Sequence, residues 1–422
     1  MRKILTSLAI IIFVAMACAA MCDEIVFDKE ILKKTPTIDG KIMPGEWEVF
    51  YTYNTENDIV TSYVNWDFDN LYFGCTLNAI ESISIVLDLN ADGWTVGDDN
   101  YLILTNENGE LDVLKVVKTG EEGVTLVNID VPETNQIHGE QSLVNGKTNL
   151  EIAIPARMVG KNNFDMGKTN FNFAIKTPEA DWNTFNPKDI TDNTIGCNLV
   201  NHKSFALAPL TLDFYLTREK AVASETIDGK VKIKNHGSEP IVIKELIMAG
   251  EGLSEDIVSS YKIKVGEIRP GKTFEREYHT KVLPDTPLGA KALGCEIYTD
   301  QMKVGGVLRS FEIINPSKSM PYLPKEVYYT NDKVIRIGVR ILSYTDKRAT
   351  TGYASVVVPE GWEIEGNNHN KFKVIGYNKY VDLIFRLTPP LGAIGHFKIP
   401  ITVNKGTEQE TVTCDFDIVQ TR

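Results

Sequence analysis

A short acidic segment of the chain has the ligand spacing of a calcium loop. Oxygen-bearing side chains stand at its first, third, fifth and twelfth positions, and a glycine follows the fifth: Asp88, Asn90, Asp92, Gly93 and Asp99. Ca²⁺ prefers oxygen ligands, and the glycine permits the sharp turn between them. Carboxylates this close together repel one another unless a cation lies between them. The segment therefore predicts a structural Ca²⁺ held by Asp88, Asn90, Asp92 and Asp99; the alternative is a polar turn whose carboxylates face solvent.

Two tryptophans lie in polar segments that a sugar could reach. Trp94 follows the glycine of the acidic segment, and Trp182 has polar neighbours at Asp181, Asn183 and Asn186. The apolar face of a sugar ring stacks on a flat aromatic ring, while amides and carboxylates bind its hydroxyl groups. We expect Trp182 and Trp94 to be stacking surfaces, with Asp181, Asn183 and Asn186 as hydrogen-bonding groups. The alternative is that these tryptophans plug the end of a sandwich.

The motifs of the common enzyme classes are missing from the sequence. Its 6 histidines are isolated, and there is no HExxH metal motif, no GxSxG nucleophile turn and no phosphate-binding loop. The 57 acidic residues always contain some candidate pair of carboxylates, so they do not by themselves indicate a glycosidase. We expect a protein that is not an enzyme, with an unrecognised glycoside hydrolase or its accessory subunit as a further alternative.

The elements that position these residues are predicted to be strands. Short β-branched or alternating segments such as 82–87, 230–234 and 354–358 recur along the chain, and no stretch keeps a helical period for long. Asn108-Gly109 and Asn145-Gly146 lie between such segments and are typical of tight hairpin turns. The sequence therefore predicts an all-β protein made of three tandem antiparallel β-sandwich domains after a signal peptide.

Several large or sulfur-containing residues are predicted to lie in strands rather than in a site. Trp47 and Trp66 occur in alternating segments and are expected in the core. The cysteines beyond the N-terminal segment lie far apart without CxxC spacing, which argues against a zinc or redox motif: Cys75, Cys197, Cys295 and Cys414. In an exported chain Cys75 and Cys197 could form a disulfide, but buried free thiols fit the spacing equally well.

A repeat divides the second half of the chain. The string Pro-Leu-Gly-Ala occurs at 287–290 and again at 390–393, and at the same offset of 103 residues the segment 230–233 falls on 333–336. An interval near 100 residues is the size of an immunoglobulin-like sandwich. This predicts one such domain at 205–315 and a second at 321–422, joined by a polar, proline-containing linker. The half resembles the immunoglobulin-like modules appended to bacterial extracellular glycosidases, through VPEGW at 358–362 and the Pro-Leu-Gly turns.

The first domain, predicted at 24–204, carries a more specific resemblance. Its sequence contains IDGKIMPGEW at 38–47, WDFDNLYF at 66–73, an acidic block at 87–101 and LEIAIP at 150–155, in that order. In this arrangement the region resembles a family-nine-like carbohydrate-binding module. The resemblance implies a β-sandwich from a group that binds sugars in secreted enzymes, and therefore a polysaccharide or another glycan as the partner.

Charge and the N-terminus limit the partners and the location. The 422-residue chain has a net charge of -13 and a pI near 5.1 without a basic run, which argues against nucleic acid and anionic membranes. Residues 1–20, with Arg2 and Lys3 before an apolar run, are typical of a secretory signal peptide. The apolar run is shorter than the roughly 20 residues of a spanning helix, so we expect no membrane span after cleavage. A small residue before Cys18 leaves a lipoprotein as the alternative.

Together these features predict a secreted or cell-surface protein that binds carbohydrate without catalysis. A calcium-stabilised N-terminal module would bind the glycan, and two immunoglobulin-like domains would act as spacers. The main alternative is a structural or adhesive protein of the cell envelope, with envelope proteins as its partners.

Overall fold

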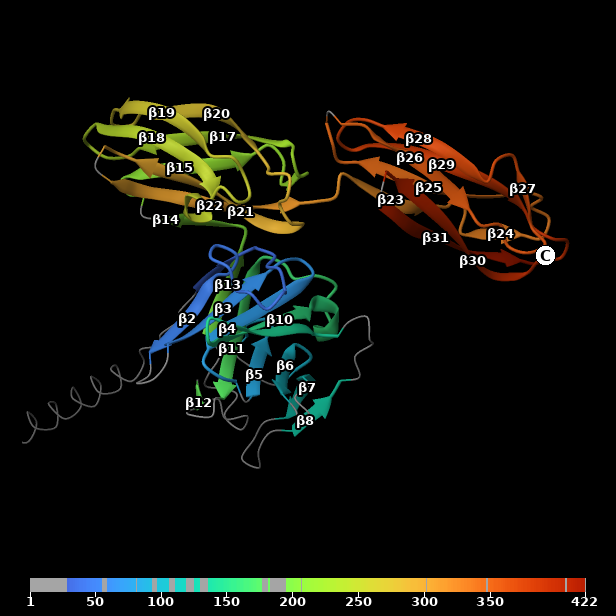
Figure 1. Ribbon diagram of the computed structural model, residues 1–422, viewed down its shortest axis with the longest axis horizontal. Helices are drawn as coiled ribbons and strands as arrows, with labels where there is room; N and C mark the ends of the chain where they lie inside the picture. The colour runs from blue at the N-terminus through green and yellow to red at the C-terminus, as the bar shows by residue number, and fades with distance from the viewer. Residues whose placement is uncertain are drawn as a thin grey trace, which may run out of the picture. The chain divides into compact units, whose positions relative to one another are not determined.

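The protein is built almost entirely from β-strands in the computed structural model (Figure 1), which confirms the all-β prediction. The structure describes residues 29–54, 59–80, 82–92, 97–105, 111–118, 125–129, 136–176, 181–182, 195–205, 207–300, 302–346, 348–406 and 408–421. Within these ranges the helical elements are single 3₁₀ turns, including η2 (Ala156–Val159) and η4 (Glu251–Leu253). None of the described helical elements has the length and apolar character that crossing a bilayer requires. The predicted signal peptide, with Cys18, lies outside the described residues.

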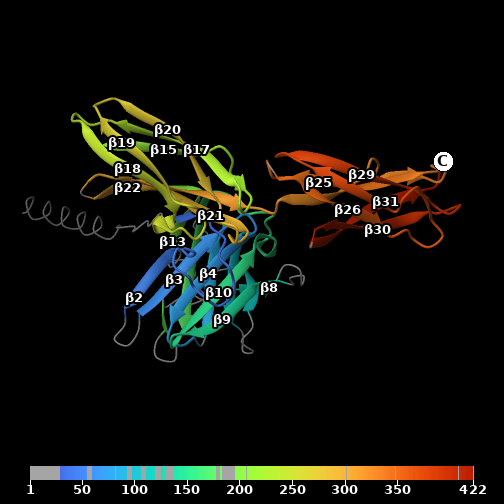
Figure 2. The same ribbon diagram turned by 45° about the horizontal axis from the view of Figure 1, so that its top comes forward.

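The chain divides into two compact units, Met1–Lys203 and Ser204–Arg422. The first unit contains two sheets. Sheet A has the order β1 (Lys29–Leu32), β13 (Ile195–Val200), β11 (Gly167–Lys176), β5 (Ser82–Asp88), β6 (Asn100–Thr105), β7 (Leu111–Lys118) and β8 (Thr125–Asn128), and β12 (Asp181–Trp182) also pairs with β11. Sheet B has the order β2 (Val49–Asn54), β3 (Ile59–Trp66), β4 (Asn70–Leu77), β10 (Lys147–Pro155) and β9 (His138–Val144), seen side by side in Figure 2.

Side chains from both sheets form one core, so the first unit is a β-sandwich, named here the N-terminal sandwich. Alternation along each strand turns every second residue inward, as at Phe73 of β4 and Ile85 of β5, both fully buried. Trp66 is 0 % exposed in this core. Trp47 is 5 % exposed but packs with Tyr72 in a separate cluster on the other face of sheet B. Both tryptophans are buried, as predicted.

Hairpins join neighbouring strands where the sequence has its turn signals. Asn145 and Gly146 have φ angles of 53° and 81° and connect β9 to β10 through the pair Val144 and Lys147. Two positive φ values in a two-residue turn match the right-handed twist of the strands it joins. The predicted hairpin at 145–146 is therefore confirmed. The strands flanking Asn108 also pair, β6 with β7, although the turn itself lies outside the described residues.

The second unit has two hydrophobic cores, each between a pair of sheets. One sheet of the first core has the order β14 (His202–Phe205), β22 (Lys303–Ile313), β21 (Gly289–Tyr298), β18 (Ile241–Gly250) and β19 (Tyr261–Ile268), and β16 (Lys220–Ala221) also pairs with β22. The other sheet of this core has the order β15 (Leu210–Leu216), β17 (Thr226–Asn235) and β20 (Thr273–Lys281). One sheet of the second core has the order β24 (Val327–Tyr329), β31 (Glu408–Val419), β30 (Gly395–Lys405), β26 (Thr350–Val356) and β28 (His369–Val374). The other sheet of this core has the order β23 (Ser317–Tyr322), β25 (Ile335–Ser343), β29 (Lys379–Thr388) and β27 (Glu363–Glu365).

The strand orders around these two cores correspond. The order β22-β21-β18-β19 matches β31-β30-β26-β28, and β15-β17-β20 matches β23-β25-β29. In each case a short strand also joins the last strand in parallel, β16 on β22 and β24 on β31. The 103-residue offset carries 230–233 in β17 onto 333–336 at the start of β25. The repeated strings therefore fall at corresponding strands, although 230–233 lies inside β17 and 333–336 begins before β25. The domain boundaries and the immunoglobulin-like assignment stay predictions.

The described cysteines lie in strands with buried, free thiols. Cys75 is in β4, Cys197 in β13, Cys295 in β21 and Cys414 in β31. Burial raises the pKa of the Cys75 thiol above its ordinary value. Of the two arrangements left open by the sequence for Cys75 and Cys197, the structure has the free thiols.

Candidate functional site

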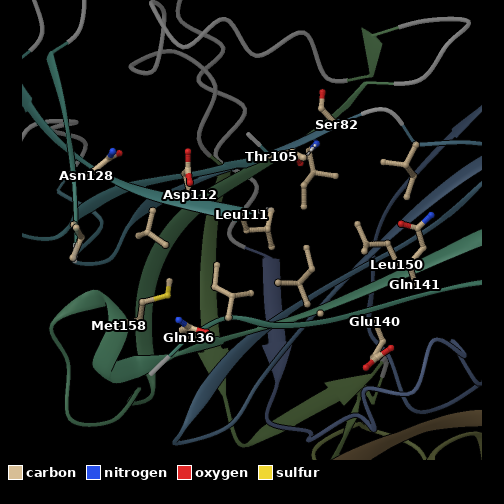
Figure 3. Close-up of a pocket in the computed structure, with 17 residues that line it drawn as sticks. Ser82, Thr105, Leu111, Asp112, Asn128, Gln136, Glu140, Gln141, Leu150 and Met158 are labelled. Atoms are coloured by element: carbon tan, nitrogen blue, oxygen red, sulfur yellow. Dashed lines mark hydrogen bonds between the residues drawn. The ribbon is translucent and has the colours of Figure 1, made fainter. Parts of the chain in front are cut away.

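An open cleft of about 790 Å³ lies between the two sheets of the N-terminal sandwich (Figure 3). Its lining comes from the start of β5, the β6–β7 pair, the end of β8, strands β9 and β10, and η2. The lining residues are Ile80, Ser82, Ile83, Thr105, Leu111, Asp112, Val113, Asn128, Ile129, Gln136, Ile137, Gly139, Glu140, Gln141, Leu150, Ile152 and Met158. The volume is within the range of small-molecule sites, roughly 300–1,000 Å³.

The cleft exists because two consecutive strands belong to different sheets. β8 ends sheet A and β9 ends sheet B, and the two do not pair with each other. The inward-facing positions of β9 are Gly139, Gln141 and Leu143, as their register with Ile152, Leu150 and Thr148 shows. Because these side chains are absent, polar or exposed, they leave the sandwich unfilled along this side. Leu143 is 72 % exposed although it is on the inward face of its strand.

Apolar and polar lining residues of the cleft point in different directions. Every apolar residue of the lining belongs to the main core of the sandwich or packs against it. Figure 3 shows Leu111, Leu150 and Met158 turned toward the space between the sheets. Ser82 and Asp112 point outward in the same view. We call the outward polar residues the rim of the cleft: Ser82, Asp112, Asn128, Gln136 and Glu140.

Of the predicted sugar-binding residues near Trp182, the backbone of Asp181 and Trp182 lies at the same end of sheet A as the cleft. Asp181 and Trp182 form strand β12, in which Trp182 is the Cα partner of Ile175, and Ile175 in turn pairs with Ile83 of the cleft lining. Asn183 and Asn186 lie outside the described residues, and so do the side chains of Asp181 and Trp182. The structure thus gives the backbone position of Trp182, about two strand spacings, roughly 10 Å, from the lining.

The described chain leads toward Trp94 from the other end of sheet A. It lies outside the described residues, between Asp92 and Gly97, in the loop that follows β5. The chain enters this loop at Asp88, whereas β12 is level with Ile83 at the other end of β5. Five residues of strand separate those positions, roughly 17 Å. The backbone therefore enters the segments of the two tryptophans from opposite ends of sheet A.

Three carboxylates of the predicted calcium loop converge. One oxygen from each of Asp88, Asp92 and Asp99 lies within 4.8 Å of the others. Asp88 is 1 % exposed and is fixed by the N–H of Ala91 (2.9 Å) and the side-chain amide of Asn170 (3.0 Å). A carboxylate can accept about four hydrogen bonds or metal contacts, so these two bonds do not by themselves saturate Asp88.

Asp99 supplies an independent sign that the cluster fits a cation. Its Oδ2 is buried and has no hydrogen-bond partner in the described part of the chain. Burial, together with the negative charges of Asp88 and Asp92, raises the pKa of Asp99 above its ordinary value. A divalent cation would satisfy this oxygen and cancel the repulsion. The donor set, carboxylate oxygens only, matches Ca²⁺ chemistry.

Asn90, the fourth predicted ligand, makes local contacts. Its side-chain oxygen accepts the N–H of Asp92 at 2.9 Å, and its amide donates to Asp92 Oδ2 at 3.0 Å. These bonds are typical of an Asx turn and orient the Asp92 carboxylate. The structure therefore brings Asp88, Asp92 and Asp99 together, with Asn90 acting on Asp92. Gly93 lies outside the described residues.

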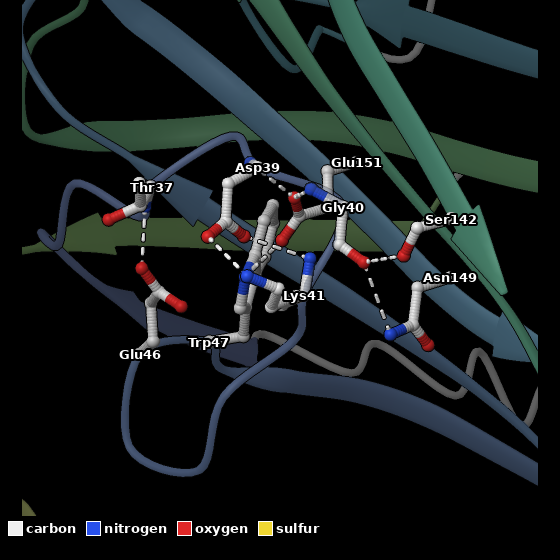
Figure 4. A network of polar contacts seen from close by, with 9 residues as sticks. All are labelled: Thr37, Asp39, Gly40, Lys41, Glu46, Trp47, Ser142, Asn149 and Glu151. Carbon is white, nitrogen blue, oxygen red and sulfur yellow. Dashed lines mark hydrogen bonds and ion pairs between the residues drawn. The ribbon is translucent and has the colours of Figure 1, made fainter. Parts of the chain in front are cut away.

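A buried carboxylate on the other face of sheet B holds the loop that precedes β2 (Figure 4). Glu151 is 0 % exposed. Its Oε2 accepts the N–H groups of Asp39 (2.9 Å) and Gly40 (2.6 Å), and its Oε1 accepts the indole N–H of Trp47 (3.2 Å). Burial raises the pKa of Glu151, and the N–H donors of Gly40 and Asp39 oppose that rise.

Gly40 is required at its place in this network. Its φ angle is 80°, and a Cβ there would lie 2.9 Å from Cβ of Ser142. Its carbonyl accepts hydrogen bonds from the Ser142 hydroxyl and from the Asn149 amide. The blocks at 38–47 and 150–155 are thus tied together by Glu151, and their polar residues stabilise the fold. The interactions seen in Figure 4 are used within the protein rather than turned toward a ligand.

Comparison with known proteins gives only weak likenesses. No protein family matches the chain, and no curated protein does. A family 9 carbohydrate-binding module from Caldicellulosiruptor kristjanssonii, solved in complex with cellotriose, has 15% identity and a TM-score of 0.29 over 40% of this chain and 92% of its own. CBD12 of CALX1.2 has 11% identity and a TM-score of 0.26 over 46% and 82%. Alpha-2-macroglobulin of E. coli has 9% identity and a TM-score of 0.22 over 85% and 32%.

The cleft was not foreseen from the sequence. Residues such as Val113 and Ile152 look like ordinary inward positions of strands, because local alternation does not show whether the opposite sheet covers them. One signal was present in β9, whose sequence HGEQSLV places glycine and glutamine at 139 and 141, where a covered strand would carry apolar residues. A strand without an apolar face indicates an uncovered edge of the sandwich.

Proposed function

We propose that the N-terminal sandwich is a calcium-stabilised, non-catalytic module that binds a carbohydrate at the β12 end of sheet A. The rest of the chain then serves as a spacer. We also propose that the protein is exported and works at the cell surface or outside the cell, as its signal-like N-terminus supports.

The observation that carries this proposal is the gathering of polar groups at the β12 end of sheet A. Asp181 is the Cα partner of Lys176, which pairs with Ser82 of the rim. The amides of Asn128 and Gln136 belong to the same rim and are exposed. Amides and hydroxyls bind sugar hydroxyl groups, and Trp182, next to Asp181 in β12, supplies the ring for the apolar sugar face.

Calcium fits the opposite end of the same sheet. Asp88, Asp92 and Asp99 would hold the ion, which would stabilise the loop and supply no catalytic step. Three carboxylates offer up to six of the six to eight oxygens that Ca²⁺ takes. The buried, unpaired Oδ2 of Asp99 supports this assignment.

We expect the protein to bind one or more polysaccharides with dissociation constants on the order of micromolar to millimolar, because a single stacking surface gives modest affinity. Trp182→Ala should abolish binding and leave the melting temperature nearly unchanged. Tyr353→Ala, which removes a ring 45 % exposed in the second unit, is the matched control and should bind normally. Glycan arrays and affinity gels measure both. Failure of the wild-type chain to bind any glycan would contradict the proposed function.

We expect a calcium chelator to lower the melting temperature of the N-terminal sandwich by roughly 5–10 °C. An ion that binds only the folded state at a hundred times its Kd contributes about 2.7 kcal/mol, and each kcal/mol shifts a domain of this size by roughly 2–4 °C. Asp92→Asn should remove the effect of the chelator, and Glu30→Gln, an exposed acid of β1, should not. Without the ion, the raised pKa of Asp99 means that its ionisation destabilises the fold. The decrease in melting temperature caused by the chelator should therefore become smaller as the pH falls into the range in which carboxylates become protonated. Identical melting with calcium and chelator would exclude the site.

A further inference from the structure

We propose that the cleft of the N-terminal sandwich binds an alkyl or acyl chain attached to an uncharged polar head. The rim residues Ser82, Asn128 and Gln136 also border the proposed carbohydrate site, but the chain would lie inside the cleft and its binding does not depend on a carbohydrate. The proposal stands on the direction of the lining side chains, on the few polar atoms inside the cleft and on the charge of its rim.

The interior of the cleft is aliphatic on both walls. Leu111 of sheet A, Leu150 of sheet B and Met158 of η2 turn toward the space between the sheets. Val113 and Ile152, from the same two sheets, also line the cleft and belong to the core. The lining contains no aromatic residue among the described residues. Flexible aliphatic surfaces without a flat ring suit a flexible hydrocarbon chain better than a sugar ring, which needs a planar partner.

Few polar atoms are available inside the cleft. The hydroxyl of Thr105 already accepts the N–H of Ile83 at 3.0 Å. Gln141 shares the inward face of β9 with Gly139 and is the other inward polar side chain of the lining. A polypeptide segment inserted here would bring N–H and C=O groups that the interior cannot pair, at a cost of roughly 1–3 kcal/mol each. A hydrocarbon chain carries no such groups.

The rim determines the head group. It offers amides and a hydroxyl at Asn128, Gln136 and Ser82, and its charged groups, Asp112 and Glu140, are both acidic. The described lining contains no lysine, arginine or histidine. A carboxylate or phosphate head would therefore find no cation among the described lining residues, so the expected head is a neutral alcohol, ether, ester or glycoside.

The test is a chain-length series with a head that carries no sugar. Octyl, decyl and dodecyl ethers of tri(ethylene glycol), each below its micelle concentration, are titrated into the full chain by calorimetry. Burial of one methylene contributes about fourfold in affinity, so octyl to dodecyl should gain on the order of a hundredfold. Dodecanoate should bind more weakly than the dodecyl ether. Equal affinity along the series, or no binding, would overturn the proposal.

Matched variants of one strand place the site. Gly139→Phe adds a ring on the inward face of β9, where a Cβ meets only ordinary contacts at 3.5 Å and beyond, and should lower dodecyl ether affinity at least tenfold. Leu143→Phe, on the same face but outside the lining, should leave it unchanged. Gln141→Trp replaces Gly139→Phe if the latter does not fold. Equal effects of the inner and outer variants would place the chain elsewhere and refute the assignment.

Discussion

Replacing Glu151 with alanine is expected to lower the free energy of unfolding of the N-terminal sandwich by about 3–6 kcal/mol, because the change leaves two buried donors and one part-buried donor without an acceptor, and each buried donor costs roughly 1–3 kcal/mol. These donors are the N–H groups of Asp39 and Gly40 and the indole N–H of Trp47. The loop before β2 would then keep only the bonds of the Gly40 carbonyl to Ser142 and Asn149 in this network. Urea denaturation of the full chain, followed by a probe of the N-terminal unit, measures the effect.

Glu140 supplies the matched control for this substitution. It is the cross-strand partner of Glu151 but is exposed, so Glu140→Ala should change stability by less than about 0.5 kcal/mol. Glu151→Gln should give an intermediate loss, since one oxygen remains for the backbone donors while its amide group faces the indole N–H. A loss below about 1 kcal/mol in Glu151→Ala would show that water reaches the donors and that the network is not closed.

Truncation of Trp66 to alanine is expected to cost about 3–5 kcal/mol, the usual range for a buried aromatic residue. The ring is fully buried, its Nε1–H donates to the carbonyl of Ile31 at 2.8 Å, and Phe68 packs edge-on at 6.3 Å between ring centroids. The truncation leaves a cavity in the main core and removes the hydrogen bond from the indole to β1. Differential scanning calorimetry should show the N-terminal transition shifted well below that of the wild type.

Two further variants separate the contribution of ring packing from that of the hydrogen bond at Trp66. Trp66→Phe keeps most of the ring but loses the bond to Ile31, so it should cost about 1–3 kcal/mol. Phe68→Ala removes a ring that is 42 % exposed and should cost less than either. If Trp66→Ala melted like the wild type, the tryptophan would have to lie outside the core that this structure assigns to it.

Strands and tight turns followed from local sequence. The alternation at 82–87 becomes β5, and the alternation at 230–234 lies within β17. Successive side chains of a strand point to opposite faces, so a difference in burial between the two faces gives the sequence a period of two. Asn145-Gly146 gave its hairpin for an equally local reason, since both residues tolerate positive φ. The convergence of Asp88, Asp92 and Asp99 was also local, because the three carboxylates come from one short stretch of chain.

Features that join distant residues were decided only by the tertiary structure. Glu151 looked like one polar position in a strand, and its partners Asp39 and Gly40 lie more than a hundred residues earlier, so no local pattern shows that it is fully buried. The cleft is even harder to predict from the sequence, because it forms where two consecutive strands, β8 and β9, end different sheets. The amino-acid sequence determined which faces of the strands are apolar and where the chain turns. Only packing of one sheet on the other decided which of those apolar faces are covered, and at β9 none of the described strands of sheet A pairs beside it to cover Gly139 and Gln141.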